Sequence, residues 1–341
     1  ASDVYKRQNY SCYFGATNNN YTEFDKLDKN RVCGIKLFMG SSTGNMLVDK
    51  MNSLLNIFNG TDLLIAAHCE NHETIKKNTE KYVKEYIEKY PHQYYHVHHE
   101  TLPMGYHAKI RSIAACYESS ELAVRLARIA DARLHILHIS TARELSLFDN
   151  DIPLEEKRIT AEACVSHLLF DSSDYPELGA RIKCNPSIKT KTNRDALRQA
   201  VNSNLIDVIA TDHAPHLLKE KEGGPLKAMS GMPMIQFSLV SMLELVNEGI
   251  FTIEKVVEKM CHAPAQIYNI HNRGFIRPGY QADLVLVRPD ALWTVSADQI
   301  LSKCGWSPLE GRTFEWKVEK TFANGHLLYT DGQVDETYRG Q

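Results

Sequence analysis

The sequence has no closely spaced cysteines. Its eight cysteines are spread singly along 341 residues, and none forms a Cys-x-x-Cys pair. Neither a disulfide framework nor a cysteine-based zinc motif is therefore indicated. Single cysteines in a chain of this length are typical of reduced thiols in a cytosolic protein, so we expect a cytoplasmic location.

A strongly charged face and long hydrophobic runs are also missing. The formal net charge is only −3, and the basic residues are scattered, so nucleic acid is not an expected partner. The longest apolar stretches fall well short of the roughly 18 residues that a membrane-spanning helix needs, so no membrane association is expected. The content of Leu, Ile and Val is ordinary for a folded globular protein.

Residues 1–8 are polar and charged and lack the apolar core of a signal peptide. They lead almost at once into an apolar segment at Tyr10 that is typical of a core strand. Because a domain rarely begins so abruptly, we expect residues 1–8 to be non-native or disordered and the natural chain to continue upstream.

Apolar runs that end in polar or glycine residues alternate with segments of helical period. This alternation is typical of a parallel sheet covered by helices. The expected strands are residues 10–16, 34–39, 63–68, 134–139, 158–164 and 206–211, and the clearest helices are residues 119–130 and 192–202. Six such repeats are too many for a small doubly wound domain and two short of a closed eight-fold barrel.

The pattern changes after Gly231. Expected helices at 234–247 and 253–268 are followed by expected strands at 282–287, 318–322 and 326–329. The last two strands flank Asn324-Gly325, which is a strong hairpin signal. We therefore expect an α/β barrel over residues 9–271 and a small β appendage over residues 272–341.

Three expected strands end in side chains that bind metal ions. His68 and His138 end two strands, and Asp212 ends a third, which is where a barrel enzyme keeps its chemistry. Taken singly, Asp212 is explained as a helix N-cap and each histidine as a satisfied structural residue. Together they indicate a metal site, and their nitrogen and oxygen donors suit Zn²⁺, with Mn²⁺ or Fe²⁺ chemically possible.

Lys36 lies inside an apolar strand, where an ammonium group is unfavourable unless it is paired or neutral. The strand alone leaves two interpretations open: a lysine that extends its head to solvent, or a neutral lysine that reacts with CO₂ to give a metal-bridging carbamate. His135 lies three residues before His138 and should point to the opposite face of its strand. We expect His135 to pack rather than to bind metal.

These segments resemble the cyclic-amide branch of the metal-dependent amidohydrolase superfamily, and within it the dihydroorotases. The resemblance covers about residues 10 to 335 and rests on six segments in the family's order. They are Gly34-Ile-Lys-Leu-Phe-Met-Gly40, Ala67-His-Cys-Glu-Asn71, His135-Ile-Leu-His-Ile-Ser-Thr141, Asn185-Pro-Ser-Ile-Lys189, Ala210-Thr-Asp-His-Ala-Pro-His216 and Gly274-Phe-Ile-Arg-Pro-Gly-Tyr-Gln-Ala-Asp-Leu-Val-Leu286.

The resemblance implies a (β/α)8 TIM-type barrel that lacks its first two strands and carries a small β appendage. It also implies two Zn²⁺ ions per complete active site. Lys36 corresponds to an N-carboxylated lysine that bridges both ions, and His68 and His138 correspond to ligands of the second ion. Asp212 corresponds to a ligand of the first ion and to the proton shuttle.

Substrate-binding positions follow from the same resemblance. They are Asn185, His216 and the backbone around Ser230 and Gly231. The final histidine of Asp212-His-Ala-Pro-His216 is characteristic of dihydroorotases, and an imidazole donor suits a substrate that bears a carboxylate. The implied partner is a small molecule, and the implied assembly is a homo-oligomer, either a dimer or a tetramer.

The implied reaction is reversible hydrolysis of (S)-dihydroorotate to N-carbamoyl-L-aspartate in pyrimidine biosynthesis. A hydroxide held between the two metals would attack the ring amide while Asp212 moves the proton to the leaving nitrogen. Hydantoinase, dihydropyrimidinase and allantoinase activities are alternatives. A non-catalytic, assembly-forming relative is an alternative of another class, although the joint presence of Lys36, His68, His138 and Asp212 argues against it.

The chain departs from the family at its start. The family's first strand ends in His-x-His, two ligands of the first metal, and an arginine and an asparagine that hold substrate follow; all should precede Tyr10, and they are absent. His96-Val-His-His99 has a similar spelling but lies after the strand of Lys36, so we expect a solvated loop there. We expect the 341-residue chain to be weakly active or inactive.

Overall fold

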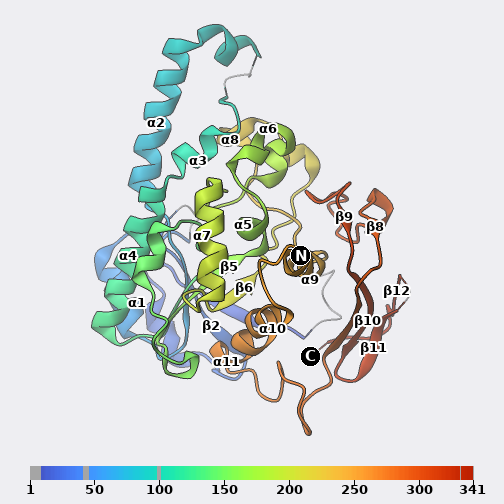
Figure 1. Cartoon of the computed structure of the whole chain (residues 1–341). Helices are drawn as coiled ribbons and strands as arrows, with labels where there is room; N and C mark the ends of the chain where they lie inside the picture. The colour runs from blue at the N-terminus through green and yellow to red at the C-terminus, as the bar shows by residue number, and fades with distance from the viewer. Residues whose placement is uncertain (1–8, 41–45, 98–100, 331, 341) are drawn as a thin grey trace.

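The computed structural model describes residues 9–40, 46–97, 101–330 and 332–340. The segment expected to be disordered, residues 1–8, lies outside them. A central sheet with helices around it forms the body, a long helix projects from one end, and an antiparallel sheet flanks the body (Figure 1). The expected α/β class is confirmed.

The central sheet has six parallel strands arranged in chain order. Each strand pairs with the next one along the chain. The strands are β1 (Cys12–Gly15), β2 (Val32–Phe38), β3 (Ile65–His68), β4 (Leu134–Ile136), β5 (Ile159–Cys164) and β6 (Val208–Ala210). All six expected strands are therefore present, and their sequential parallel order is that of a TIM-type barrel.

Strand β4 is shorter than expected because the chain turns before His138. The backbone N–H of Leu137 still donates to the carbonyl of Ala67 at 3.0 Å, but His138 adopts a left-handed conformation with φ +40°. A left-handed residue cannot continue a strand. The turn therefore ends β4 at Ile136 and sets the direction of the His138 side chain.

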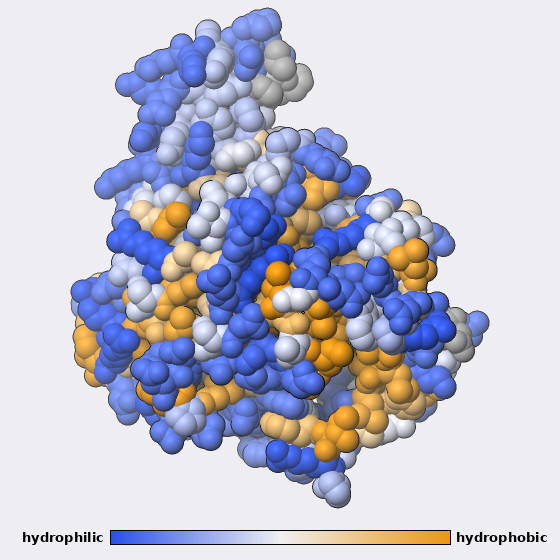
Figure 2. Space-filling model, in the orientation of Figure 1, coloured by the Kyte–Doolittle hydropathy of each residue, from blue (hydrophilic) through white to orange (hydrophobic). Residues whose placement is uncertain are grey.

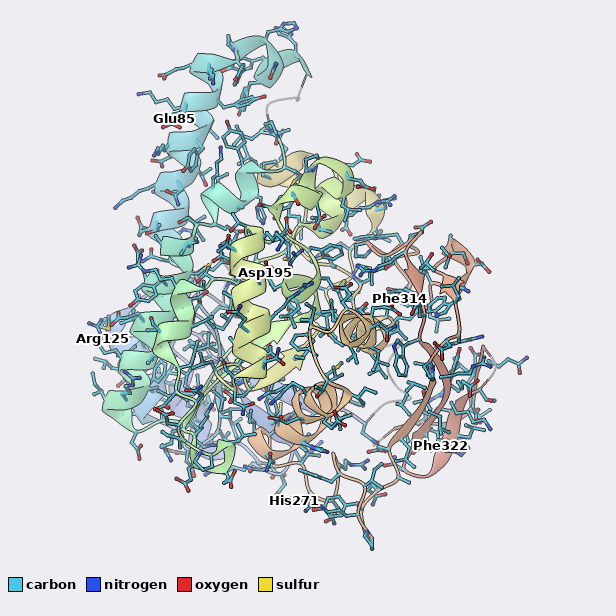
Figure 3. The ribbon with its side chains drawn as sticks, in the orientation of Figure 1. Glu85, Arg125, Asp195, His271, Phe314 and Phe322 are labelled. Atoms are coloured by element: carbon cyan, nitrogen blue, oxygen red, sulfur yellow. The ribbon has the colours of Figure 1, made fainter. Side chains whose placement is uncertain are left out.

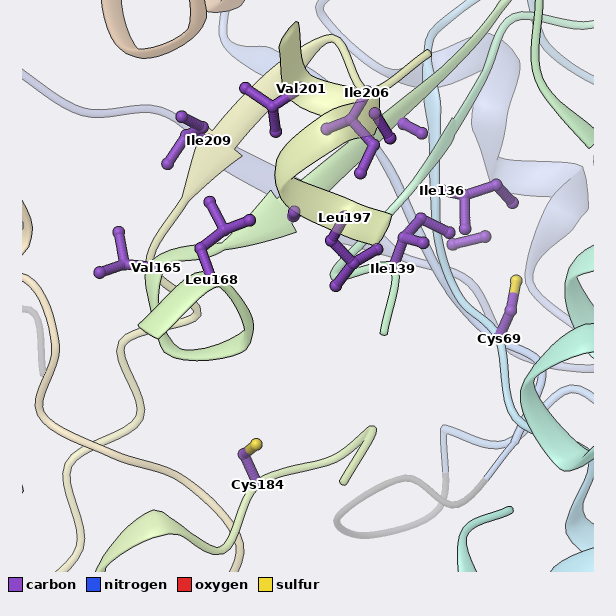
Figure 4. Packing of buried hydrophobic residues seen from close by; sticks show 14 of the residues in the cluster. Cys69, Ile136, Ile139, Val165, Leu168, Cys184, Leu197, Val201, Ile206 and Ile209 are labelled. Carbon is purple, nitrogen blue, oxygen red and sulfur yellow. The ribbon is translucent and has the colours of Figure 1, made fainter. Parts of the chain in front are cut away.

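Helices surround the sheet. They are α1 (Met51–Asn59), α2 (His72–Lys89), α3 (Tyr106–Ile110), α4 (Ile113–Ala130), α5 (Val165–Leu169), α6 (Tyr175–Leu178), α7 (Lys191–Asn202), α8 (Gly224–Lys227), α9 (Ser238–Asn247), α10 (Ile253–Val257) and α11 (Ala263–Ile267). Of these, α2 instead extends away from the sheet, and α3, α6 and α8 lie beyond one of its ends (Figure 1). Figure 4 shows Leu197 and Val201 of α7, one turn apart, among the isoleucines of the strand region. All of these side chains belong to one buried cluster, so the apolar stripe of α7 is its core face.

Two expected helices differ from their predicted bounds. The helix expected at 234–247 begins only at Ser238, and before it the backbone N–H of Ile235 donates to His213 Nδ1 at 3.2 Å. The helix expected at 253–268 is divided into α10, a π-helical turn at Glu258–His262, and α11. Pro264 lies in the first turn of α11, where its missing N–H disturbs the regular helical ladder.

The β appendage contains an antiparallel sheet of order β12-β11-β10-β7. Its strands are β7 (Leu284–Arg288), β10 (Lys317–Ala323), β11 (His326–Thr330) and β12 (Gln333–Val334), and a separate pair joins β8 (Trp293–Thr294) to β9 (Thr313–Phe314). Asn324 and Gly325 both have positive φ, as a type I′ turn requires, so the expected hairpin is confirmed. The domain boundary between residues 271 and 272 stays a prediction.

Helix α2 forms a projecting arm (Figure 1). Its surface is predominantly hydrophilic (Figure 2), and Glu85 points outward from it (Figure 3). Tyr86 and Tyr94 belong to a separate small cluster of buried residues that stabilises the arm. Within the described part of the chain, no helix is long and apolar enough to cross a membrane.

Asp207 is a buried carboxylate immediately before β6, with a relative exposure of 2%. One carboxylate oxygen lies 2.8 Å from Lys157 Nζ, and the other accepts a 2.9 Å hydrogen bond from the backbone N–H of Ala161 in β5. Asp207 therefore joins β5 to the segment that leads into β6. These two contacts explain why the apolar run contains a charged residue, Asp207.

We expect Asp207→Ala to lower the free energy of unfolding by about 3–5 kcal/mol, because it leaves the ammonium of Lys157 buried without its carboxylate. Chemical denaturation measures the effect. The control is Asp195→Ala on α7 (Figure 3), which removes an exposed pair with Lys191 and a second contact with Arg194. It should cost under about 1 kcal/mol. Equal losses in the two variants would contradict this account of the sheet.

Candidate metal centre

The parallel register brings Lys36 and His68 to one face of the sheet. Phe38 of β2 lies opposite His68 of β3, and Lys36 lies opposite Ala66. Residues two apart on a strand share a face. Lys36 Nζ lies 4.5 Å from the centre of the Phe38 ring, and that ring lies 5.8 Å from the ring of His68.

His68 and His138 form a close imidazole pair. His68 Nδ1 lies 3.0 Å from His138 Nε2, and both residues are buried, with exposures of 5% and 4%. Two nitrogens bound to one tetrahedral Zn²⁺ lie about 3.3 Å apart, given Zn–N bonds of about 2.05 Å. The observed separation therefore fits two ligands of one metal ion after a small adjustment.

The backbone at two expected ligands is unusual. His138 has φ +40° and Asp212 has φ +43°. Among the described non-glycine residues with positive φ, all except His138 are Asn or Asp, which tolerate this region better than other residues do, so His138 is the exceptional one. Backbone strain of this kind concentrates at functional sites, and here it fixes His138 just beyond the end of its strand.

Asp212 and Lys36 influence each other's charge. Asp212 is accessible to solvent but closely surrounded by protein. Burial raises the pKa of Asp212, and Glu162 adds to the increase, while His68 and Lys36 oppose it. Burial lowers the pKa of Lys36, and Asp212 and Glu162 oppose that shift. Both surroundings favour the uncharged forms.

His138 is suited to metal binding because it stays neutral. Burial lowers its pKa well below the usual value, and the nearby His68 and Lys36 lower it further. Among the described residues, no three His, Cys, Asp or Glu side chains converge closely enough to hold a metal ion. The structure thus brings two expected ligands together and leaves Asp212 outside ligand distance of that pair.

His135 packs in the sheet interior, as expected. It is fully buried, with Nδ1 2.8 Å from Thr160 Oγ1 and Nε2 3.1 Å from Glu162 Oε2. The other carboxylate oxygen of Glu162 accepts a 3.3 Å hydrogen bond from the backbone N–H of His138. Glu162 thus connects the packed histidine to the candidate ligand. No signal in the sequence identified this role, because the three contacts join different strands.

Three expected substrate-binding positions lie together in the structure. His216 Nε2 is 3.1 Å from the carbonyl oxygen of Ser230. Gly231 has φ +141°, and a Cβ there would come within 2.5 Å of the carbonyl oxygen of Ala214. Only glycine therefore allows the two loops to approach so closely.

Asn185 is connected to this cluster through its own loop. The backbone N–H of Gly231 donates to the carbonyl of Lys183, two residues before Asn185, at 2.8 Å. Asn185 Oδ1 is buried without a hydrogen-bond partner among the described residues. An unpaired buried amide oxygen costs about 1–3 kcal/mol, so this atom is available to accept a hydrogen bond from a ligand.

Two lysines that the sequence did not single out hold these loops in place. Lys221 Nζ donates to the carbonyls of Lys183, Met229 and Gly231 at 3.1, 2.7 and 2.6 Å. Lys183 Nζ donates in turn to the carbonyl of Ala228. Burial lowers the pKa of each lysine to about 8. Their partners are backbone carbonyls distant in sequence, so a sequence motif does not reveal them.

The histidines of the arm lie in a different environment. His96 is exposed within a short π-helical turn, Gln93–Val97, instead of the expected loop. Its ring contacts that of His92, with 5.1 Å between the centroids. The other two histidines of that motif, His98 and His99, lie outside the described residues.

Comparisons with known proteins agree with this architecture. The chain is 31% identical to a dihydroorotase from Pyrococcus furiosus over 306 residues, which is 90% of this chain and 63% of that enzyme. It is 30% identical to an allantoinase from Bacillus velezensis over 227 residues, covering 66% of this chain and 50% of that enzyme. The chain thus spans between about half and two thirds of the length of these relatives.

Structural similarity points the same way. The L-hydantoinase (dihydropyrimidinase) from Arthrobacter aurescens superimposes with a TM-score of 0.87 at 25% identity, covering 98% of this chain and 73% of that one. The sequence profile of the amidohydrolase family matches residues 39–328, which include β3 to β6 and every candidate site residue except Lys36. The chain belongs to the amidohydrolase family.

Proposed function

We propose that the protein is a metal-dependent cyclic amide hydrolase of the dihydroorotase type. It would interconvert dihydroorotate and N-carbamoyl-aspartate, in the ring-closing direction during pyrimidine synthesis. The observation that carries the proposal is the facing pair His68 Nδ1 and His138 Nε2, 3.0 Å apart at the ends of adjacent strands. The identity to the archaeal dihydroorotase supports the choice of reaction.

The proposed metal ligands are Lys36, His68, His138 and Asp212. Bound Zn²⁺ supplies a Lewis acid for the amide carbonyl and makes water nucleophilic at neutral pH. Lys36 would contribute as a carbamate: its neutral Nζ forms a bond to the carbon of CO₂ and loses a proton to water. The environment that lowers the pKa of Lys36 favours this neutral amine.

Asp212 would move the proton. A carboxylate with a raised pKa accepts a proton more readily than an ordinary aspartate does, and it can then donate that proton to a leaving group. Asp212 is solvent-accessible, so a substrate can reach it. It would accept the proton of the attacking water and give it to the leaving ring nitrogen.

The loop cluster would hold the substrate. Asn185 Oδ1 is a buried acceptor without a partner among the described residues, and it suits a ring N–H. His216 would bind the substrate carboxylate. Its Nε2 contacts the Ser230 carbonyl, and Nδ1 lies 3.9 Å from Glu220, so carboxylate binding requires the ring to leave one of these contacts.

Hydrolysis of hydantoin-like rings or allantoin is the second candidate. The fold of the L-hydantoinase from Arthrobacter aurescens and the sequence of the allantoinase from Bacillus velezensis both favour it. These rings carry no carboxylate on the ring carbon. The histidine at position 216 therefore distinguishes the two candidates.

We expect the Zn²⁺-loaded whole gene product to hydrolyse dihydroorotate faster than dihydrouracil, hydantoin or allantoin. His216→Ala should raise KM for dihydroorotate by at least about tenfold, since a hydrogen bond to a charged group contributes about 1.5–3 kcal/mol. KM for any neutral ring should change little. A preference for allantoin or hydantoin would instead establish the second candidate.

Asp212→Ala should abolish turnover, because no other proposed group accepts the proton. Steady-state rates with dihydroorotate, measured in both directions, test this. The matched control is Asp195→Ala on the outer face of α7, which should keep wild-type kcat. Near-normal turnover by Asp212→Ala would contradict the proposed mechanism.

A further inference from the structure

The ring nitrogen of His68 that faces away from His138 contacts a buried carboxylate. His68 Nε2 lies 3.0 Å from Glu70 Oε2, and Glu70 has no exposed surface. The guanidinium of Arg111 pairs with the same carboxylate oxygen. Arg111, Glu70, His68 and His138 therefore form one continuous line of polar contacts.

The backbone holds Glu70 firmly in this line. The next residue, Asn71, donates its backbone N–H to the carbonyl of Ala115 at 2.7 Å and caps helix α2 with its side chain. On the other side, a Cβ on Gly40 would come within 1.7 Å of the carbonyl oxygen of Glu70. Gly40 therefore lies directly against the backbone of Glu70, and the backbone that carries the carboxylate is held from both sides.

Arg111 is also fixed. Its backbone N–H donates to the carbonyl of His107 at 2.9 Å, and its own carbonyl accepts a 3.0 Å hydrogen bond from Ser187 Oγ. Burial of a carboxylate is unfavourable without a compensating charge. The fixed guanidinium provides that charge, so Glu70 faces His68 as an ionised group.

The carboxylate determines where the proton of His68 lies. An ionised carboxylate only accepts hydrogen bonds, so the proton in the contact between His68 and Glu70 belongs to Nε2. In a neutral imidazole the other nitrogen then carries a lone pair. That nitrogen, Nδ1, is the one directed at His138.

His138 is held differently. Its Nδ1 is buried without a hydrogen-bond partner among the described residues. Its position instead comes from its left-handed backbone and from the 3.3 Å hydrogen bond between its backbone N–H and Glu162. In the metal-free protein the lone pair of His68 Nδ1 accepts from the Nε2–H of His138. Of the two imidazoles, only His68 is bound through its side chain to a carboxylate among the described residues.

We propose that Glu70, supported by Arg111, is a positioning residue that holds His68 as the Nε2–H tautomer and so presents Nδ1 to a metal ion shared with His138. The inference rests on the proposed function only in requiring a metal site. Carboxylates that bind the second nitrogen of a metal-binding histidine generally fix its orientation and strengthen its binding. Glu70 touches neither substrate nor metal in this account.

Metal affinity tests the proposal without any activity assay. Glu70→Gln keeps the size of the side chain, but its amide can donate as well as accept, so it no longer dictates the His68 tautomer. We expect its Zn²⁺ dissociation constant, measured by competition with a chelator, to rise about 10- to 100-fold. Arg111→Met should weaken Zn²⁺ binding in the same direction.

Glu144→Gln is the matched control. Glu144 is also buried, with 2% exposure, but it accepts from Ser120 and Thr141 and contacts no histidine in the part of the chain that the structure describes. The control should bind Zn²⁺ as the wild type does. If Glu70→Gln and Glu144→Gln lose affinity equally, the effect is one of general stability and the proposal is wrong.

The tautomer can be read directly in the wild-type protein, so the test does not depend on a variant that folds. Long-range ¹H–¹⁵N correlation spectra of metal-free, ¹⁵N-histidine-labelled protein should show His68 as the Nε2–H form, identified by its loss in His68→Gln. A Nδ1–H form would overturn the proposal. Absence of Zn²⁺ binding by the wild type would contradict the proposed function. The tautomer of His68 separately tests the role proposed for Glu70.

Discussion

The parallel register between β2, β3 and β4 is the constraint on which the candidate centre depends. It places Phe38 opposite His68 and Ala67 opposite Ile136, so that His68 and His138 leave adjacent strands at the same edge. A shift of one residue in β3 would turn His68 to the outer face of the sheet. Glu70 and Glu162 then orient two histidines that the sheet has already brought together.

Several ionisable groups lie at this edge of the sheet, and each affects the pKa of its neighbours. Lys36 and Asp212 lie within electrostatic reach of each other, and both are shifted towards their uncharged forms. Glu70 is different, since Arg111 and His68 outweigh its burial and hold its pKa at about 2. The site thus combines groups that can exchange protons or bind CO₂ with a carboxylate that stays charged.

The sequence predicted the strands, including those of the β appendage, and it placed His68 and His138 at strand ends, because buried strands leave a local apolar pattern that ends at polar residues. Their role as ligands of one metal ion came from the family resemblance and stays a prediction. Contacts between distant segments could not be predicted in this way. Arg111 meets Glu70 across 41 positions, and Lys221 meets Lys183 across 38. The left-handed turn at His138 was also missed, because positive φ is uncommon for any residue other than glycine and the apolar pattern around His138 continues the strand.

X-ray diffraction of crystals grown with Zn²⁺, collected at the zinc absorption edge, tests the central claim most directly. The account predicts an anomalous peak about 2.1 Å from both His68 Nδ1 and His138 Nε2, with Glu70 still bound to His68 Nε2. A zinc ion bound elsewhere, or bound to His68 through Nε2, would contradict it.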